Sequence, residues 1–170
     1  NFIQPYQKKR ILSFLNPESD PLGQGYQLIQ SKIALGSGGL MGKGYLKGTQ
    51  SYLEYLPEKQ TDFIFTLIGE EFGFIGTIFI ISLFLILIFI CFYVSIKSYH
   101  LFGRILSLGI ASNLFIYVVL NMSMVTGLMP VVGIPLPLIS YGGTAMLSMM
   151  ILFGLLLNVD IHYSEKKIHR

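Results

Sequence analysis

Charged residues are scarce in this chain. Only 12% of its 170 residues are charged, whereas 52% are hydrophobic, and its mean hydropathy is +0.63. Soluble domains usually carry about a quarter charged residues. The shortage of charge therefore excludes an ordinary soluble domain and predicts a membrane protein. The net charge of +3 is small and gives no reason to expect a nucleic-acid partner.

Cysteine and histidine are also rare. The single cysteine, Cys91, lies inside an apolar run, and one thiol excludes both a disulfide framework and a thiolate metal site. The three histidines, at 100, 162 and 169, lack the spacing of zinc ligands. The sequence therefore predicts neither a disulfide scaffold nor a zinc centre, and we assign no metal-ligating residue.

The chain begins at Asn1 and opens with polar residues. This opening differs from the basic and then apolar start of a secretory signal. We therefore expect no signal peptide, and we expect the chain to be the C-terminal part of a longer membrane protein.

Two long stretches contain no charged residue, at 72–96 and at 105–159. A membrane-spanning helix needs about 20 apolar residues, so the first stretch fits one helix and the second is too long for one. The sequence MPVVGIPLP at 129–137 divides the second stretch, because its three prolines cannot all lie inside a helix. The sequence therefore predicts an all-α polytopic membrane protein with three transmembrane helices.

The charges in the short connections predict the orientation. Lys97 and Arg104 flank the first connection, the second connection has no charge, and the C-terminal tail carries three basic residues. Positive residues in short loops favour the cytoplasmic side of the membrane. We therefore place the first connection and the tail in the cytoplasm, and residues 1–70 and the second connection outside.

These predictions divide the chain into seven segments. They are an extracytoplasmic loop with short interfacial helices at 1–72, a transmembrane helix at 73–97, a cytoplasmic loop at 98–104, a transmembrane helix at 105–127, an extracytoplasmic loop at 128–140, a transmembrane helix at 141–160 and a cytoplasmic tail at 161–170. The prolines and glycines of the loop at 128–140 are compatible with either a tight turn or a re-entrant loop.

Glycine is concentrated in IALGSGGLMGKGYLKGTQ, residues 33–50. The phosphate-binding P-loop pattern fails here, because Ser37 replaces its first glycine and Gly44 replaces its final Ser or Thr. Two interpretations remain, namely a flexible connector or a loop whose bare backbone lets a substrate approach closely. Lys43 and Lys47 give this segment positive charge.

Charged residues also gather in LPEKQTDFIF, residues 56–65, just before the first apolar stretch. Pro57 suits the first turn of a helix, and Glu58 and Asp62 then share one helix face. A carboxylate in this partly apolar setting is suited to general base catalysis. Surface pairing at the start of a helix explains the same charges, and the residue types alone favour that second interpretation.

Four other polar residues lie at or within the apolar stretches. We interpret Glu70 and Glu71 as marking the helix that enters the membrane, and Asn113 and Asn121 as hydrogen-bonding groups between helices. The predicted spans otherwise lack buried acidic or basic residues, which weighs against a transport pathway.

Taken together, four stretches resemble the SEDS family (shape, elongation, division and sporulation), whose members polymerise peptidoglycan. They are GYQLIQSKIALGSGGLMGKG at 25–44, LPEKQTDFIF at 56–65, GEEFGFIG at 69–76 and MPVVGIPLPLISYGG at 129–143. They occur in the order of the family and cover most of the chain. IQSKIALGSGG and PVVGIPLP are similar to elongation-type rather than division-type members. Gln60 departs from the family, which usually has histidine there, so we assign residue 60 no proton-transfer role.

The resemblance implies a ten-helix fold, of which this chain is the outer loop after the seventh helix and the last three helices. It implies polymerisation of lipid II during cell elongation, by an inverting glycosyl transfer in which Asp62 is the base. Lys43 and Lys47 are candidates for stabilising the departing pyrophosphate, and a divalent cation such as Mg²⁺ or Mn²⁺ is the alternative. The other candidate substrate-binding residues are Gln50, Glu58, Thr61, Ser140 and Tyr141.

The resemblance also implies a location and partners. The location is the bacterial inner (cytoplasmic) membrane. The partners are a class B penicillin-binding protein that acts as a transpeptidase, other membrane proteins of the elongation complex and membrane lipids. Three alternatives stay open: a lipid II flippase, a scaffold that recruits a transpeptidase, and a division-type member of the family. Without the first seven helices, we expect this chain alone to be inactive.

Overall fold

The computed structural model describes residues 5–19, 23–49 and 60–168. All regular secondary structure within these ranges is helical. The elements are α1 (Pro5–Leu15), the short 3-10 helix η1 (Pro17–Ser19), α2 (Gln24–Ser37), α4 (Ile64–Lys97), α5 (Leu101–Thr126) and α6 (Gly143–Ile168). The predicted all-α class is therefore confirmed.

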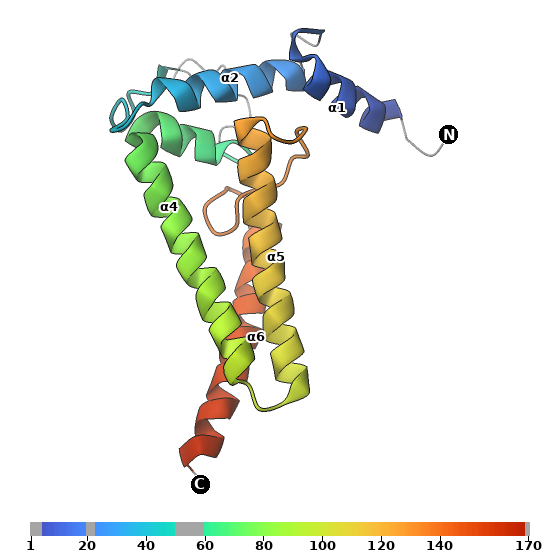
Figure 1. Ribbon diagram of the computed structural model, residues 1–170, viewed down its shortest axis with the longest axis vertical. Coiled ribbons are helices and arrows are strands. Elements are labelled where there is room, and N and C mark those ends of the chain that lie inside the picture. The colour runs from blue at the N-terminus through green and yellow to red at the C-terminus, as the bar shows by residue number, and fades with distance from the viewer. Residues whose placement is uncertain (1–4, 20–22, 50–59, 169–170) are drawn as a thin grey trace.

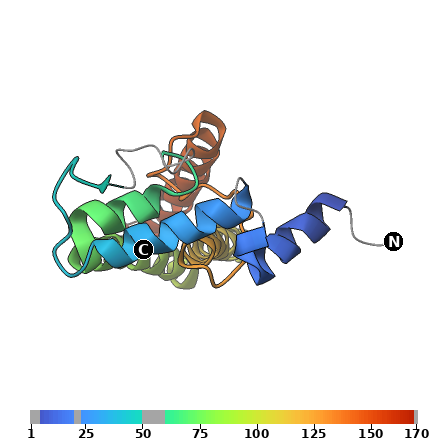
Figure 2. The ribbon, with the colours of Figure 1, turned by 90° about the horizontal axis from the view of Figure 1, so that it is seen from above.

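The three longest helices form the body of the molecule. Figure 1 shows α4, α5 and α6 running alongside one another, with α1 and α2 lying across one end. The view from above agrees, since α2 crosses over the ends of the long helices (Figure 2). Three helical stretches are long and apolar enough to cross a membrane, namely α4, α5 and Gly143–Ile161 of α6. The chain is thus a multi-pass membrane protein with the three predicted spans.

Apolar side chains both fill the interior of this bundle and cover its outside. Phe84 of α4 packs in the same buried cluster as Leu114 and Val118 of α5. In contrast, Phe79 and Phe89 of α4 point outward and are 62% and 69% exposed. Large exposed apolar faces are rare on soluble proteins. These faces suit contact with lipid or with further helices.

The helix α4 changes direction at Gly73. This residue has φ 66° and ψ −160°, so α4 consists of a short first part, residues 64–72, and a long second part that continues to Lys97. Figure 1 shows the first part lying beside α2 and the second part descending along α5. The membrane boundary predicted at residue 73 coincides with this corner, although where the bilayer begins stays a prediction.

Only glycine fits at the Gly73 corner. A Cβ atom there would lie 2.3 Å from the backbone nitrogen of Gly42, and the positive φ is costly for other residues. Beside it, Phe74 N donates to Gly39 O (2.9 Å) and Ile75 N donates to Leu40 O (3.2 Å). The amide groups at the start of the second part therefore bond to the glycine-rich segment.

The helix α2 is fixed to the end of α5 by a small polar residue. Ser31 is fully buried, and its Oγ lies 3.0 Å from Val125 O and 2.9 Å from Leu28 O. Such small hydroxyl residues let two helices approach closely. The layer formed by α2 is therefore attached to α5 directly beside the connection that follows that helix.

Candidate functional site

The second connection, residues 127–142, folds back along α5 instead of turning directly into α6. α5 ends at Thr126, and the next residue, Gly127, has φ 75°, the left-handed conformation that commonly terminates helices. The connection then returns until Ile134 O accepts a bond from Asn121 Nδ2 at 2.7 Å. Asn121 lies about 7 Å before the end of α5, from the rise of a helix. The prolines of the connection keep this returning backbone non-helical.

The returning connection binds the turn that precedes α4. Three consecutive carbonyl groups of this turn, those of residues 60–62, each accept a hydrogen bond from α5 or from the second connection. The bonds join Tyr141 N to Gln60 O (2.9 Å), Ser140 Oγ to Thr61 O (2.6 Å) and Asn121 Nδ2 to Asp62 O (2.9 Å). Two motifs that are far apart in the sequence therefore form one site. The sequence predicts a hydrogen bond between helices for Asn121; its two bonds go instead to this turn and to the second connection.

Asp62 is at the centre of this arrangement. Its side chain is half-buried, and a Cβ atom at Gly133 would lie 3.2 Å from Asp62 Oδ2. The carboxylate therefore faces bare backbone of the second connection. Phe63, the next residue, is 1% exposed and anchors the turn in the core. Because α4 begins at Ile64, Asp62 also lies at the positive end of the helix dipole of residues 64–72.

The other predicted residues of this turn and connection have different environments. Ser140 is buried, and besides its bond to Thr61 its Oγ accepts a bond from Leu136 N at 2.7 Å. Thr61 is half-buried, whereas the Tyr141 side chain is 79% exposed. Their substrate contacts stay a prediction. Gln50 and Glu58 lie outside the described residues.

Ser140→Ala is expected to lower the free energy of unfolding by about 1–3 kcal/mol, because it leaves Leu136 N and Thr61 O buried without this partner. Thermal unfolding of the full-length protein in detergent measures the change. Ser148→Ala is the matched control, since Ser148 is exposed and bonds only to Ala145 O of its own helix. A similar loss for both variants would contradict the structural role of Ser140.

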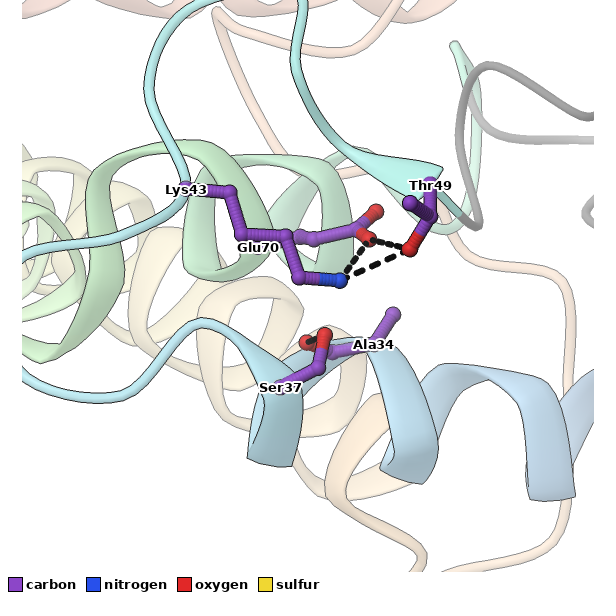
Figure 3. Close-up of polar contacts among 5 residues, drawn as sticks. All are labelled: Ala34, Ser37, Lys43, Thr49 and Glu70. Atoms are coloured by element: carbon purple, nitrogen blue, oxygen red, sulfur yellow. Dashed lines mark hydrogen bonds and ion pairs between the residues drawn. The ribbon is translucent and has the colours of Figure 1, made fainter.

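A second polar cluster lies at the other end of residues 64–72. Lys43 Nζ is 2.8 Å from Glu70 Oε1 and 2.8 Å from Thr49 Oγ1, and the hydroxyl of Thr49 donates to the same carboxylate oxygen at 3.2 Å. Figure 3 shows the three groups meeting at one point, above the end of α2. The Glu70 side chain is fully buried and that of Lys43 is 26% exposed. Sequence reasoning predicts no partner for Glu70, because the pair forms between segments that only the fold brings together.

The glycine-rich segment wraps around this part of α4. Its backbone follows α4 closely, because Lys43 N donates to Glu70 O and Gly44 N donates to Glu71 O, each at 3.0 Å. A Cβ atom at Gly42 would lie 2.1 Å from Glu71 O. The bare backbone of Gly42 is therefore needed for close approach to this chain itself. Neither sequence interpretation anticipated this use of the glycines.

The two lysines of this segment differ in their surroundings. Lys43 is engaged by Glu70, whereas Lys47 is exposed. The predicted role of either lysine at a pyrophosphate stays a prediction. Within the described ranges, no group of three His, Cys, Asp or Glu residues is placed to hold a metal ion.

Sequence reasoning missed two basic residues beside the second connection. Arg10 Nη1 donates to Val132 O at 3.0 Å, next to the glycine that faces Asp62. The Lys32 side chain passes over Gly127, where a Cβ atom would lie 2.0 Å from Lys32 Cε. Both residues come from α1 and α2, so the only available signal was the general basic character of residues 1–70.

A family model and individual relatives all place the sequence in the same family. The sequence model of the FtsW/RodA/SpoVE family, described as a cell cycle protein, matches residues 1–165. The chain is 50% identical over 160 residues to the peptidoglycan glycosyltransferase MrdB of Escherichia coli K12, covering 94% of this chain and 43% of the relative. It is 51% identical over 155 residues to a probable peptidoglycan glycosyltransferase FtsW of Trichlorobacter lovleyi, covering 91% and 40%.

The fold comparison agrees. A chain from a solved structure described as "Structural coordination of polymerization and crosslinking by a peptidoglycan synthase complex" matches with a TM-score of 0.73 and 35% identity. The match covers 95% of this chain and 43% of that chain. The chain thus spans less than half the length of these relatives.

Proposed function

The chain belongs to the FtsW/RodA/SpoVE family, and on that premise we propose that it supplies the catalytic carboxylate of a peptidoglycan glycosyltransferase. The observation that carries the proposal is the position of Asp62. Its backbone is held by Asn121 and its carboxylate faces Gly133, in a turn bonded at three consecutive carbonyls. Such fixed placement is what a general base requires.

The proposed reaction joins two molecules of lipid II, a disaccharide-peptide linked to a lipid pyrophosphate. The 4-hydroxyl oxygen of one sugar attacks the anomeric carbon of another and forms the new glycosidic bond. The bond from that carbon to pyrophosphate breaks, and the lipid pyrophosphate leaves with the electron pair. Asp62 takes the hydroxyl proton, and attack opposite the leaving group inverts the anomeric centre.

The departing pyrophosphate needs positive charge nearby. Because Lys43 is engaged by the buried Glu70, Lys47 presents the more accessible charge of the two predicted lysines. Arg10 adds a cation beside the second connection. We propose that these side chains, or a divalent cation brought with the substrate, stabilise the leaving group.

The proposed location follows from the charges of the connections. We propose a multi-pass protein of the bacterial cytoplasmic membrane, with residues 1–70 outside and the C-terminus in the cytoplasm. Asp62 then lies on the outer side, shortly before the corner at Gly73. The sugars of a lipid-linked substrate lie at that membrane surface, so the base and its substrate share one location.

We further propose partnership with a crosslinking enzyme of the class B penicillin-binding protein type. The similar solved chain is described as part of a complex that coordinates polymerisation and crosslinking. An elongation role is proposed from IQSKIALGSGG and PVVGIPLP. The identities of 50% to MrdB and 51% to a probable FtsW are too close to separate elongation from division.

The direct test uses the full-length protein that contains this chain, reconstituted in vesicles with fluorescent lipid II. We expect glycan strands, visible as a ladder on a gel. Transfer of lipid II between the leaflets without glycan would support a flippase and contradict the proposal. Normal assembly of a transpeptidase complex without either activity would support a scaffold and would also contradict it.

A further inference from the structure

We infer that Asn121 is a positioning residue that sets the Asp62 carboxylate against the second connection. The inference rests on the proposed function, because it matters for catalysis only if Asp62 is the base. It concerns a residue near the C-terminal end of α5 whose hydrogen bonds go to backbone carbonyls and not to the carboxylate.

One amide group holds both sides of the candidate site. Asn121 is fully buried, and its Nδ2 donates to Asp62 O at 2.9 Å and to Ile134 O at 2.7 Å. A side-chain amide nitrogen has two hydrogens, and each is used here. Because the amide is planar and rigid, it fixes the spacing of two backbone segments that are otherwise far apart in the sequence.

That spacing determines the surroundings of the carboxylate. Gly133 directly precedes Ile134, and a Cβ atom on Gly133 would lie 3.2 Å from Asp62 Oδ2. The two backbones that Asn121 joins are therefore the two that face each other at the carboxylate. A general base must lie within about 2.6–3.2 Å of the proton that it removes. A misplacement of about 1 Å can reduce the rate about 100-fold.

The other end of the amide supports a role for its donor end. Asn121 Oδ1 is buried and has no hydrogen-bond partner among the described residues. Buried polar atoms without a partner are uncommon and costly. A residue chosen only to stabilise the helix bundle would avoid this cost. What the amide contributes here is its two donor hydrogens, which neither a hydroxyl nor a carboxylate can provide.

The test compares Asn121→Asp, Asn121→Ala and the control Asn113→Ala in the full-length protein. Asn113 lies on the same helix and is exposed. For both variants at 121 we expect kcat for lipid II polymerisation to fall about 10- to 100-fold, with KM changed little, because the base acts on the chemical step. We expect Asn113→Ala to retain wild-type kcat.

The pH profile separates positioning from general stability. At low pH the carboxyl group of Asn121→Asp becomes protonated and regains one donor hydrogen. The activity of this variant relative to wild type should therefore rise as the pH falls. A stable Asn121→Ala with wild-type kcat would overturn the inference. If that variant does not fold, a pH-independent activity ratio for Asn121→Asp would overturn it.

These outcomes are distinct from a failure of the proposed function. Retained activity in Asp62→Asn would show that Asp62 is not the general base and would reject the proposed function. Retained activity in the Asn121 variants, with Asp62→Asn inactive, would leave the base in place and reject only the role of Asn121.

Discussion

Asp62→Asn is expected to reduce lipid II polymerisation by the full-length protein about 10²- to 10⁴-fold, the usual contribution of a general base. Asparagine has nearly the same shape but cannot accept the hydroxyl proton. The bonds from Asn121 and Ser140 to this turn use backbone carbonyls, which the substitution leaves in place, so we expect the variant to fold. Initial rates with fluorescent lipid II measure the effect, and thermal unfolding in detergent verifies the fold.

The matched control is Asp160→Asn. Asp160 lies near the far end of α6, its side chain is 42% exposed, and it pairs with Lys97 at 3.3 Å. Such an exposed pair contributes about 0–1 kcal/mol, so activity and stability should stay near wild type. A folded Asp62→Asn variant that polymerises at the wild-type rate would show that the base lies elsewhere.

Lys43→Met is expected to lower the free energy of unfolding by about 3–5 kcal/mol, because it removes the Lys43 counter-charge from the buried Glu70 carboxylate. Glu70 is fully buried, and its carboxylate also accepts a hydrogen bond from the Thr49 hydroxyl. The shift of the thermal unfolding midpoint in detergent measures the loss. Lys47→Met is the control, since Lys47 lies in the same segment but is exposed, and it should change stability by about 0.5 kcal/mol or less.

A double variant identifies the pair as the cause. Glu70→Gln removes the buried charge, so combining it with Lys43→Met should recover part of the stability lost in Lys43→Met alone. If Lys43 instead binds pyrophosphate, Lys43→Met would slow polymerisation while leaving the unfolding midpoint unchanged. That result would contradict the structural role and support the catalytic one.

Much of the fold could be predicted because its signals are local. The absence of charge over 72–96 and 105–159 determines the spans, and the prolines at 129–137 divide the second stretch. The family motifs then singled out Asp62. Each of these signals is contained in a short run of residues and needs no knowledge of what packs against it.

The contacts of the site could not be predicted in this way. The proximity of Ser140 to substrate stays a prediction, but the sequence does not indicate that its hydroxyl joins two backbone groups of the chain itself. The sequence predicts only that Glu70 marks the entry of a helix into the membrane, whereas the structure shows a buried ion pair between Glu70 and Lys43. Sequence shows that a polar residue is present, but its partner depends on which distant segments the fold brings together.

The change of direction at Gly73 could not be predicted from the sequence for the same reason. The stretch 64–97 contains three glycines, at 69, 73 and 76, and no local pattern distinguishes the one at which the helix changes direction. The need for glycine arises from the backbone of Gly42, which belongs to a segment about thirty residues earlier. Only tertiary contact imposes the change of direction.

The order of synthesis has a consequence for this site. Asp62 leaves the ribosome long before Ser140, which follows its partner Thr61 by 79 residues. Both hydrophobic helices α4 and α5 are therefore made before the second side of the site exists. A nascent chain halted within α5 carries the Asp62 turn without the bonds from Ser140 and Tyr141. Completion of the site is thus a late step in biogenesis, tied to emergence of the residues that lead into α6.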